Sequence, residues 1–170
     1  MKRLLILGGV IVLSAGLFLG PRAEPEVHLA SEPPSGYEFV YSQGPRLDDG
    51  WFTRIEGSTY RPKSTPRQDI GVRVVTYPSA AFRHLMSWTE IPPNPNFPND
   101  AFGIESPELK GIGLGDDVIW CGSDQPENCS AWGYWSHYKN QLLTVVIYVD
   151  TRVGTMTPDD FRNIVREIFP

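Results

Sequence analysis

Two neighbouring segments in the C-terminal third of the chain constrain the fold most strongly. Residues 131–138 read AWGYWSHY and residues 142–149 read LLTVVIYV, with the polar triplet KNQ between them. Two strand-like segments joined by so short a polar connection predict a β-hairpin. Residues 142–149 are apolar on both faces, which is typical of a strand covered on both sides. The sequence therefore predicts that this second strand is central in its sheet.

Alternation along the first segment divides its rings between two faces. One face carries four side chains: Trp132, Tyr134, Ser136 and Tyr138. Trp135 and His137 fall on the other face. Rings that face solvent form a flat surface on which sugars or peptides stack, whereas rings that face the helices fill a core. Core packing is the interpretation we prefer, and the candidate binding residues under the alternative are Trp132, Tyr134, Trp135, His137 and Tyr138.

Further strands and two helices complete the predicted elements. The other strands are expected at residues 37–41, 51–56, 70–77 and 117–121, and the helices at residues 78–90 and 157–169. Thr157 and Pro158 are typical of a helix N-terminus, and the apolar residues that follow recur with helical spacing. Gly and Pro number 16 each, which argues against a helical bundle. This order predicts an α+β fold: an antiparallel sheet with two helices packed on one face and one disulfide-closed loop.

The first residues of the chain determine the compartment that we expect. Lys2 and Arg3 precede an uncharged run of 17 residues from Leu4 to Gly20. A basic end before such a run directs the following chain across a membrane. The length of the run lies between that of a signal-peptide core and that of a spanning helix. Residues 1–23 are therefore expected to be a signal peptide or an N-terminal membrane anchor.

The remaining chain divides into a spacer and one domain. Residues 24–36 are rich in Pro, Glu and Ser and predict a proline-rich linker. Residues 37–170 are long enough for a single extracytoplasmic α+β domain. The domain is expected to be membrane-anchored and facing outside the cytoplasm, or secreted or periplasmic after cleavage. Residues 91–101 hold four prolines and three asparagines, and this irregular loop is either functional or merely permissive.

Cys121 and Cys129 are the two cysteines of the chain. Their spacing differs from that of a CxxC redox pair, and with His137 they still fall short of four zinc ligands. In an exported domain the default for such a pair is a disulfide. The sequence therefore predicts a disulfide that closes a small loop.

The net charge and the spacing of glycines and acidic residues argue against several other kinds of binding site. The net charge is −5 and no Lys/Arg cluster occurs in the domain, so we expect no nucleic-acid binding. The run GIGLGD at residues 111–116 leads into a strand rather than a helix, unlike a phosphate-binding loop. The acid pairs at residues 48–49 and 116–117 lack the spacing of an EF-hand. We expect no metal and no cofactor.

A family resemblance is carried by four features in order along the chain. These are VVTYPSA at residues 74–80, GLGD at residues 113–116, the two cysteines and the closing helix. The layout resembles small extracytoplasmic sensor-like or lipoprotein α+β domains of bacteria, and it spans most of residues 37–170. The resemblance implies a binding or sensing module rather than an enzyme. No cysteine follows the apolar run, so attachment through a lipid does not carry over.

The functional expectation is a binding or interaction module that meets an extracytoplasmic ligand or protein and is tethered through its N-terminal segment. One alternative is a small extracytoplasmic hydrolase that uses His137 as a base, although no GxSxG elbow surrounds a serine. The other is a structural envelope component without a small ligand. Exposed rings favour binding, and a cleft in which His137 meets a carboxylate and a hydroxyl favours catalysis.

Overall fold

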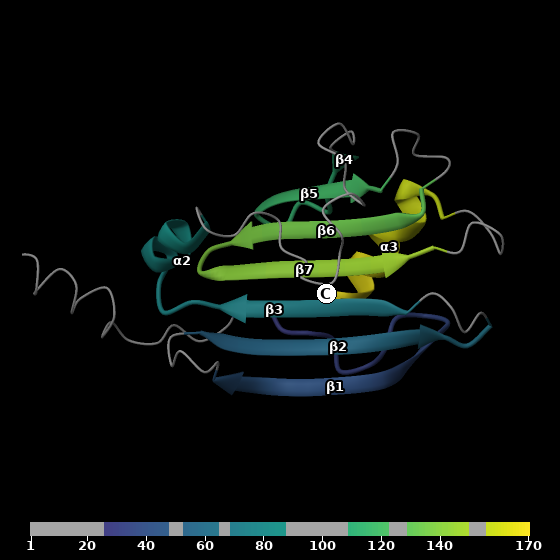
Figure 1. The fold of residues 1–170 in the computed structure, drawn as a ribbon, viewed down its shortest axis with the longest axis horizontal. Helices are drawn as coiled ribbons and strands as arrows, with labels where there is room; N and C mark the ends of the chain where they lie inside the picture. The colour runs from purple at the N-terminus through teal and green to yellow at the C-terminus, as the bar shows by residue number, and fades with distance from the viewer. Residues whose placement is uncertain (1–25, 48–52, 65–68, 88–108, 123–128, 150–155) are drawn as a thin grey trace, which may run out of the picture.

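A computed structural model describes residues 26–47, 53–64, 69–87, 109–122, 129–149 and 156–170. Within these ranges the chain forms one seven-stranded sheet and two helices (Figure 1). The strands are β1 Tyr37–Leu47, β2 Arg54–Pro62, β3 Ile70–Thr76, β4 Leu109–Lys110, β5 Asp116–Cys121, β6 Ala131–Tyr138 and β7 Gln141–Tyr148. The helices are α2 Ala80–Ser87 and α3 Pro158–Ile168. The predicted antiparallel sheet with two helices is thereby confirmed.

The strands follow the order β1-β2-β3-β7-β6-β5-β4, and every neighbouring pair is antiparallel. Strand β7 is fourth of the seven and pairs with β3 on one side and β6 on the other. This position confirms the prediction from its two apolar faces. Strands β1 and β2 are longer than expected because they remain paired from Tyr37 opposite Pro62 to Leu47 opposite Arg54.

The first face of the sheet, which is covered by α3, holds the main core. In Figure 1 this helix lies behind β6 and β7. Residues directly opposite in the register share a face, so Val74 and Leu143 lie side by side there. Trp132 of β6 is fully buried on this face and stacks on Phe161 of α3, with ring centroids 5.8 Å apart. Aromatic packing between sheet and helix therefore anchors α3.

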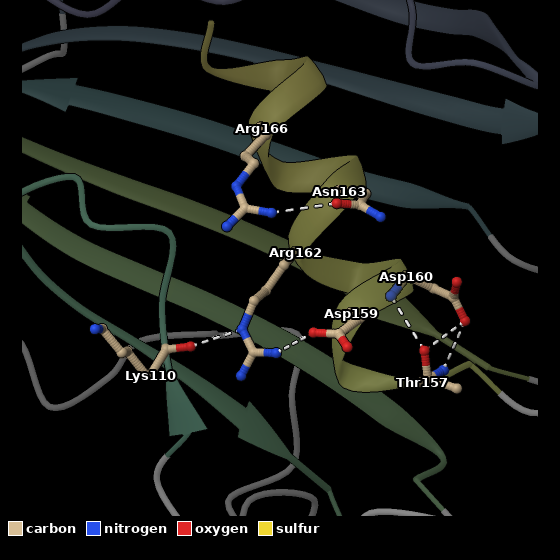
Figure 2. A network of polar contacts seen from close by, with 7 residues as sticks. All are labelled: Lys110, Thr157, Asp159, Asp160, Arg162, Asn163 and Arg166. Carbon is tan, nitrogen blue, oxygen red and sulfur yellow. Dashed lines mark hydrogen bonds and ion pairs between the residues drawn. The ribbon is translucent and has the colours of Figure 1, made fainter.

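Helix α3 begins with the cap that the sequence predicts. The Thr157 hydroxyl accepts the Asp160 N–H at 3.2 Å, and the Asp160 carboxylate accepts the Thr157 N–H at 3.1 Å (Figure 2). The Thr157 hydroxyl also donates to the Asp160 carboxylate at 2.7 Å. This bond, together with the one from the Thr157 N–H, holds the pKa of Asp160 below its usual value. The exposed side carries Arg162, which donates to the Lys110 carbonyl at 2.9 Å. The cap fixes where the helix starts, and Arg162 ties it to the edge of the sheet.

Helix α2 contacts the opposite face of the sheet. Its Phe82 belongs to a second apolar cluster with Val75, Tyr77 and Leu142. Val75 alternates with Val74 along β3, so the two clusters lie on opposite faces. The expectation that both helices share one face is therefore corrected. Helical spacing shows that a helix has an apolar side, but it does not show which face of the sheet receives that side.

Residues 26–36, which belong to the expected linker, lie against the domain. The fully buried Gln141 side chain accepts the N–H groups of Glu26 at 3.1 Å and Val27 at 2.9 Å. It also donates to the Val27 carbonyl at 2.8 Å. The Ala30 N–H donates to the carbonyl of Ile168, in the last turn of α3, at 3.0 Å. This part of the chain is held by part-buried hydrogen bonds rather than extended away from the body.

Replacing Gln141 with leucine is expected to release this segment. The variant keeps a similar volume but removes four hydrogen bonds, three to the backbone of residues 26–27 and one to the Thr76 hydroxyl. The cost is about 1–3 kcal/mol because these polar groups lose their partners. Hydrogen exchange at the N–H groups of Glu26 and Val27 should accelerate. The matched control is Lys139→Ala, which removes the exposed ion pair with Glu26 and the contact with the Tyr138 ring but no bond to Val27. It should leave the Val27 exchange rate unchanged. Equal exchange in both variants would contradict the anchoring role of Gln141.

Candidate functional site

Five side chains gather on the second face near α2, and we call them the second-face cluster. They are Trp120 and Asp116 of β5, Trp135 and His137 of β6, and Arg83 of α2. The indoles of Trp120 and Trp135 stack at 28° with centroids 5.7 Å apart, and the Trp135 and His137 rings are 4.4 Å apart. Asp116 is directly opposite His137 in the register. Rings and ionisable groups therefore meet in one place.

The register of β5 and β6 explains how the two indoles meet. Trp120 is opposite Gly133, and Trp135 is opposite Val118, so the tryptophans are diagonal neighbours on one face. Diagonal neighbours are within reach of aromatic side chains. Because Gly133 has no side chain, the indole of Trp120 meets no competing group directly across the strand pair. The stack thus follows from a glycine placed opposite one of its members.

Three polar atoms of the cluster are buried and have no hydrogen-bond partner among the residues that the structure describes. They are Arg83 Nε, Trp135 Nε1 and His137 Nε2. Buried polar atoms are normally paired, and each unpaired one costs about 1–3 kcal/mol. Three such atoms lie on side chains of this one cluster, whereas the described part of the main core holds two others, Tyr60 Oη and Trp132 Nε1. The three atoms of the cluster are chemically suited to receive a hydrogen-bonding ligand.

The environment of His137 keeps its imidazole neutral at pH 7. Burial lowers the pKa of His137 most, the positive charge of Arg83 lowers it further, and His84 adds to this effect. Asp116 opposes these effects and raises the pKa, but the net direction is downward. A neutral imidazole donates from one nitrogen and accepts at the other. His137 therefore enters the site as an uncharged hydrogen-bonding group.

Stability should depend on pH through His137. Its folded pKa lies below the unfolded value of about 6.5, so the unfolded chain binds more protons between the two values. The stabilising contribution is complete above about pH 6.5 and is lost as the pH falls through the folded pKa. Urea unfolding at pH 7 and pH 5 should show a larger loss for the unaltered chain than for His137→Gln. Equal losses would show that His137 does not titrate in this way.

The glycine-rich run before β5 folds around a carboxylate of the same chain. Asp117 Oδ2 accepts the N–H groups of Ile112 at 2.6 Å, Gly113 at 2.8 Å and Leu114 at 3.1 Å. A Cβ at Gly111 would lie 2.4 Å from the Asp117 carboxyl carbon, so glycine is required for this close approach. The backbone donors that a phosphate would need are thus already used by Asp117.

The five predicted binding residues do not lie together. Trp132 and Tyr134 are 0% and 1% exposed on the first face, so neither ring is part of an open surface. Burial raises the pKa of Tyr134. Tyr138 is half-buried with Lys139 Nζ 5.4 Å from its ring centroid. Trp135 and His137 lie on the opposite face, as the alternation predicts, and they belong to the second-face cluster.

Sequence patterns identified neither Trp120 nor Arg83 as a site residue, and they presented Asp116 only as part of an acid pair. Trp120 precedes Cys121 in a strand, where alternation places it on the face opposite to that of Ile119. This was the one signal for its position on the same face as Trp135. Arg83 follows the buried Phe82, and nothing local shows that α2 brings it to His137. Both assignments depend on contacts between elements that are distant in the sequence.

The cysteine pair lies on the first face beside the core. Cys121 and Cys129 are at disulfide distance, with Cα atoms 5.5 Å apart. Both are buried, and Cys121 is opposite Trp132 in the register. The pair therefore joins the end of β5 to the segment that enters β6.

Oxidation of the two thiols should be visible in mass and in stability. The purified chain is expected to weigh about 2 Da less than its reduced form. Replacing both cysteines with serine should lower the free energy of unfolding by about 2–3 kcal/mol, because the unfolded chain loses a small closed loop. A chain whose thiols both react with a maleimide after denaturation without reductant would contradict the linkage.

Comparisons with family models, curated proteins and solved structures give no match. No helix within the described ranges is long and apolar enough to cross a membrane. The predicted leader at residues 1–23 and the loop at residues 91–101 lie outside those ranges. Among the described residues, no group of three or more His, Cys, Asp or Glu side chains is placed to hold a metal ion.

Proposed function

We propose that this chain is an exported binding module, tethered by residues 1–23 or released after their cleavage, and that the second-face cluster is its binding site. One observation carries the proposal: the three buried atoms of Arg83, Trp135 and His137 that lack partners within the described structure. A ligand that pairs with them recovers free energy that the folded chain alone does not. The stacked indoles beside them supply apolar contact area.

The surroundings of His137 favour binding over hydrolysis. A hydrolase needs a nucleophile next to the base and an acid that orients the base. Asp116 is opposite His137, but the hydroxyl groups described on β6 and β7 nearby are engaged elsewhere. Ser136 donates to the Leu114 carbonyl from the first face, and Thr144 donates to the Arg73 carbonyl at 3.1 Å. A purely structural component would gain nothing from unpaired buried donors, so binding is the better-supported role.

A binding screen tests the proposed site. The full-length chain, held in a non-ionic detergent, is applied to glycan and peptide arrays alongside Trp135→Ala and Tyr41→Ala. Tyr41 is an exposed ring on β1 and serves as the matched control. Signals that disappear with Trp135→Ala and persist with Tyr41→Ala support the site. Signals that persist in Trp135→Ala would place binding elsewhere.

Export needs its own measurement. Expression in a bacterial host, followed by fractionation, should place the chain in the membrane or the periplasm. The mass of the purified chain distinguishes an intact N-terminus from one cleaved near residue 23. A full-length chain recovered from the cytosol would contradict the proposed location.

A further inference from the structure

We infer that the second-face cluster binds the carboxylate of a small ligand whose body is planar and apolar. The inference rests on the proposed function and adds the chemical class of the ligand. The carboxylate pairs with Arg83 and Trp135, and the body of the ligand lies against the stacked indoles.

The hydrogen-bonding character of the unpaired atoms selects an acceptor. A guanidinium N–H and an indole N–H only donate, so Arg83 Nε and Trp135 Nε1 require acceptor atoms. His137 Nε2 takes either role, because a neutral imidazole has one donor and one acceptor nitrogen. An ionised carboxylate has two oxygens that only accept, and it matches this set. An amide or a hydroxyl also brings donor groups, and His137 Nε2 is the one atom of these three that can accept from them.

The charges around the cluster favour an anion. Arg83 forms no ion pair with the residues that the structure describes, so none of their carboxylates neutralises its positive charge directly. Asp116 is exposed and forms no hydrogen bond to Arg83 within the same ranges. Arginine pairs with carboxylates through charge-assisted bonds about twice as strong as neutral ones. A single arginine beside a neutral His137 suits one negative charge better than the two of a phosphate monoester.

The rings beside these donors indicate the rest of the ligand. Trp120 and Trp135 are half-buried and nearly parallel, with an interplanar angle of 28°. Phe82 and Leu142 extend the apolar surroundings next to Trp135. Flat rings and aliphatic side chains pack well against a planar apolar group. Benzoate combines both chemical features and is the simplest probe.

The test compares ligands that differ in charge. Binding of sodium benzoate, benzamide, acetate and phenyl phosphate to the full-length chain in non-ionic detergent is measured by calorimetry at pH 7. Benzoate is expected to bind at least about tenfold tighter than benzamide, because only benzoate forms the charge-assisted pair. Arg83→Gln should abolish this preference, and Trp135→Phe, which keeps a ring but removes the N–H, should weaken benzoate binding several-fold. The control Arg166→Gln alters an exposed residue of α3, far along the chain from the cluster, and should leave benzoate binding unchanged.

The outcomes separate the ligand class from the site. Equal binding of benzamide and benzoate, or tighter binding of phenyl phosphate, overturns the carboxylate and leaves the proposed function standing. If none of the four probes binds while the array signals still depend on Trp135, the carboxylate inference is likewise overturned and the proposed function still stands. If Arg83→Gln does not fold, the Trp135→Phe result decides: unchanged benzoate affinity overturns the inference.

Discussion

Replacing Trp132 with alanine should remove most of the stability of the domain. Its side chain is 0% exposed and stacks on Phe161, so the change leaves a large cavity between β6 and α3. Substitutions of buried aromatic residues by alanine cost about 3–5 kcal/mol, out of a total of about 5–15 kcal/mol for a typical domain. The midpoint of urea unfolding, followed by far-ultraviolet circular dichroism, measures the loss.

Two controls separate packing from side-chain chemistry. Trp132→Phe keeps a ring against Phe161 and also removes the Trp132 Nε1–H, which is buried without a partner among the described residues. It should therefore cost clearly less than Trp132→Ala. Tyr41→Ala removes a ring that is 58% exposed and should change the free energy of unfolding by less than about 0.5 kcal/mol. A Trp132→Ala midpoint equal to that of Tyr41→Ala would contradict the described core.

Replacing Gly115 with alanine should also be severely destabilising. Gly115 has a φ of +74°, a region that other residues adopt at a cost. An added Cβ would lie 2.3 Å from the His137 carbonyl oxygen and 3.1 Å from the Tyr138 Cα. Both atoms belong to the backbone of β6, so no side-chain rotation relieves the clash. Backbone strain and overpacking together predict a loss of about 2–5 kcal/mol in urea unfolding.

Two other glycines provide the matched series. Gly113 has a φ of +90° but open space around the position of a Cβ, so Gly113→Ala should show the backbone strain without the clash. Gly71 on β3 has open space and no positive φ, and Gly71→Ala should cost little. The expected order of destabilisation is Gly115, then Gly113, then Gly71. A Gly115→Ala variant as stable as Gly113→Ala would show that the turn does not press against β6 as described.

Patterns within single elements predicted much of this fold. The two apolar faces of residues 142–149 correctly indicated the central strand, and strand alternation correctly separated Trp132 from Trp135. The cap at Thr157 and the helical spacing that follows it correctly indicated α3. In each case the signal lies within one element, where hydrophobic period and capping chemistry act directly on the local backbone.

Contacts between distant segments were not predictable in the same way. The side chain of Gln141 binds residues 26–27 across more than 100 positions of sequence, and polar composition suggested only a linker there. Arg83 reaches the environment of His137 because α2 packs on the second face, which no local period reveals. The candidate site therefore emerged from the register of β5 and β6 and from the placement of α2.

The most direct test of the account follows the indole N–H signals of the full-length chain by two-dimensional ¹H–¹⁵N NMR during a benzoate titration. Assignment uses the corresponding Trp→Phe variants. The account predicts that the Trp135 signal shifts most and the neighbouring Trp120 signal moves with it, while the Trp132 signal beneath α3 stays fixed. A titration in which Trp135 does not move, or in which Trp132 moves as far as Trp135, would contradict a binding site on the second face.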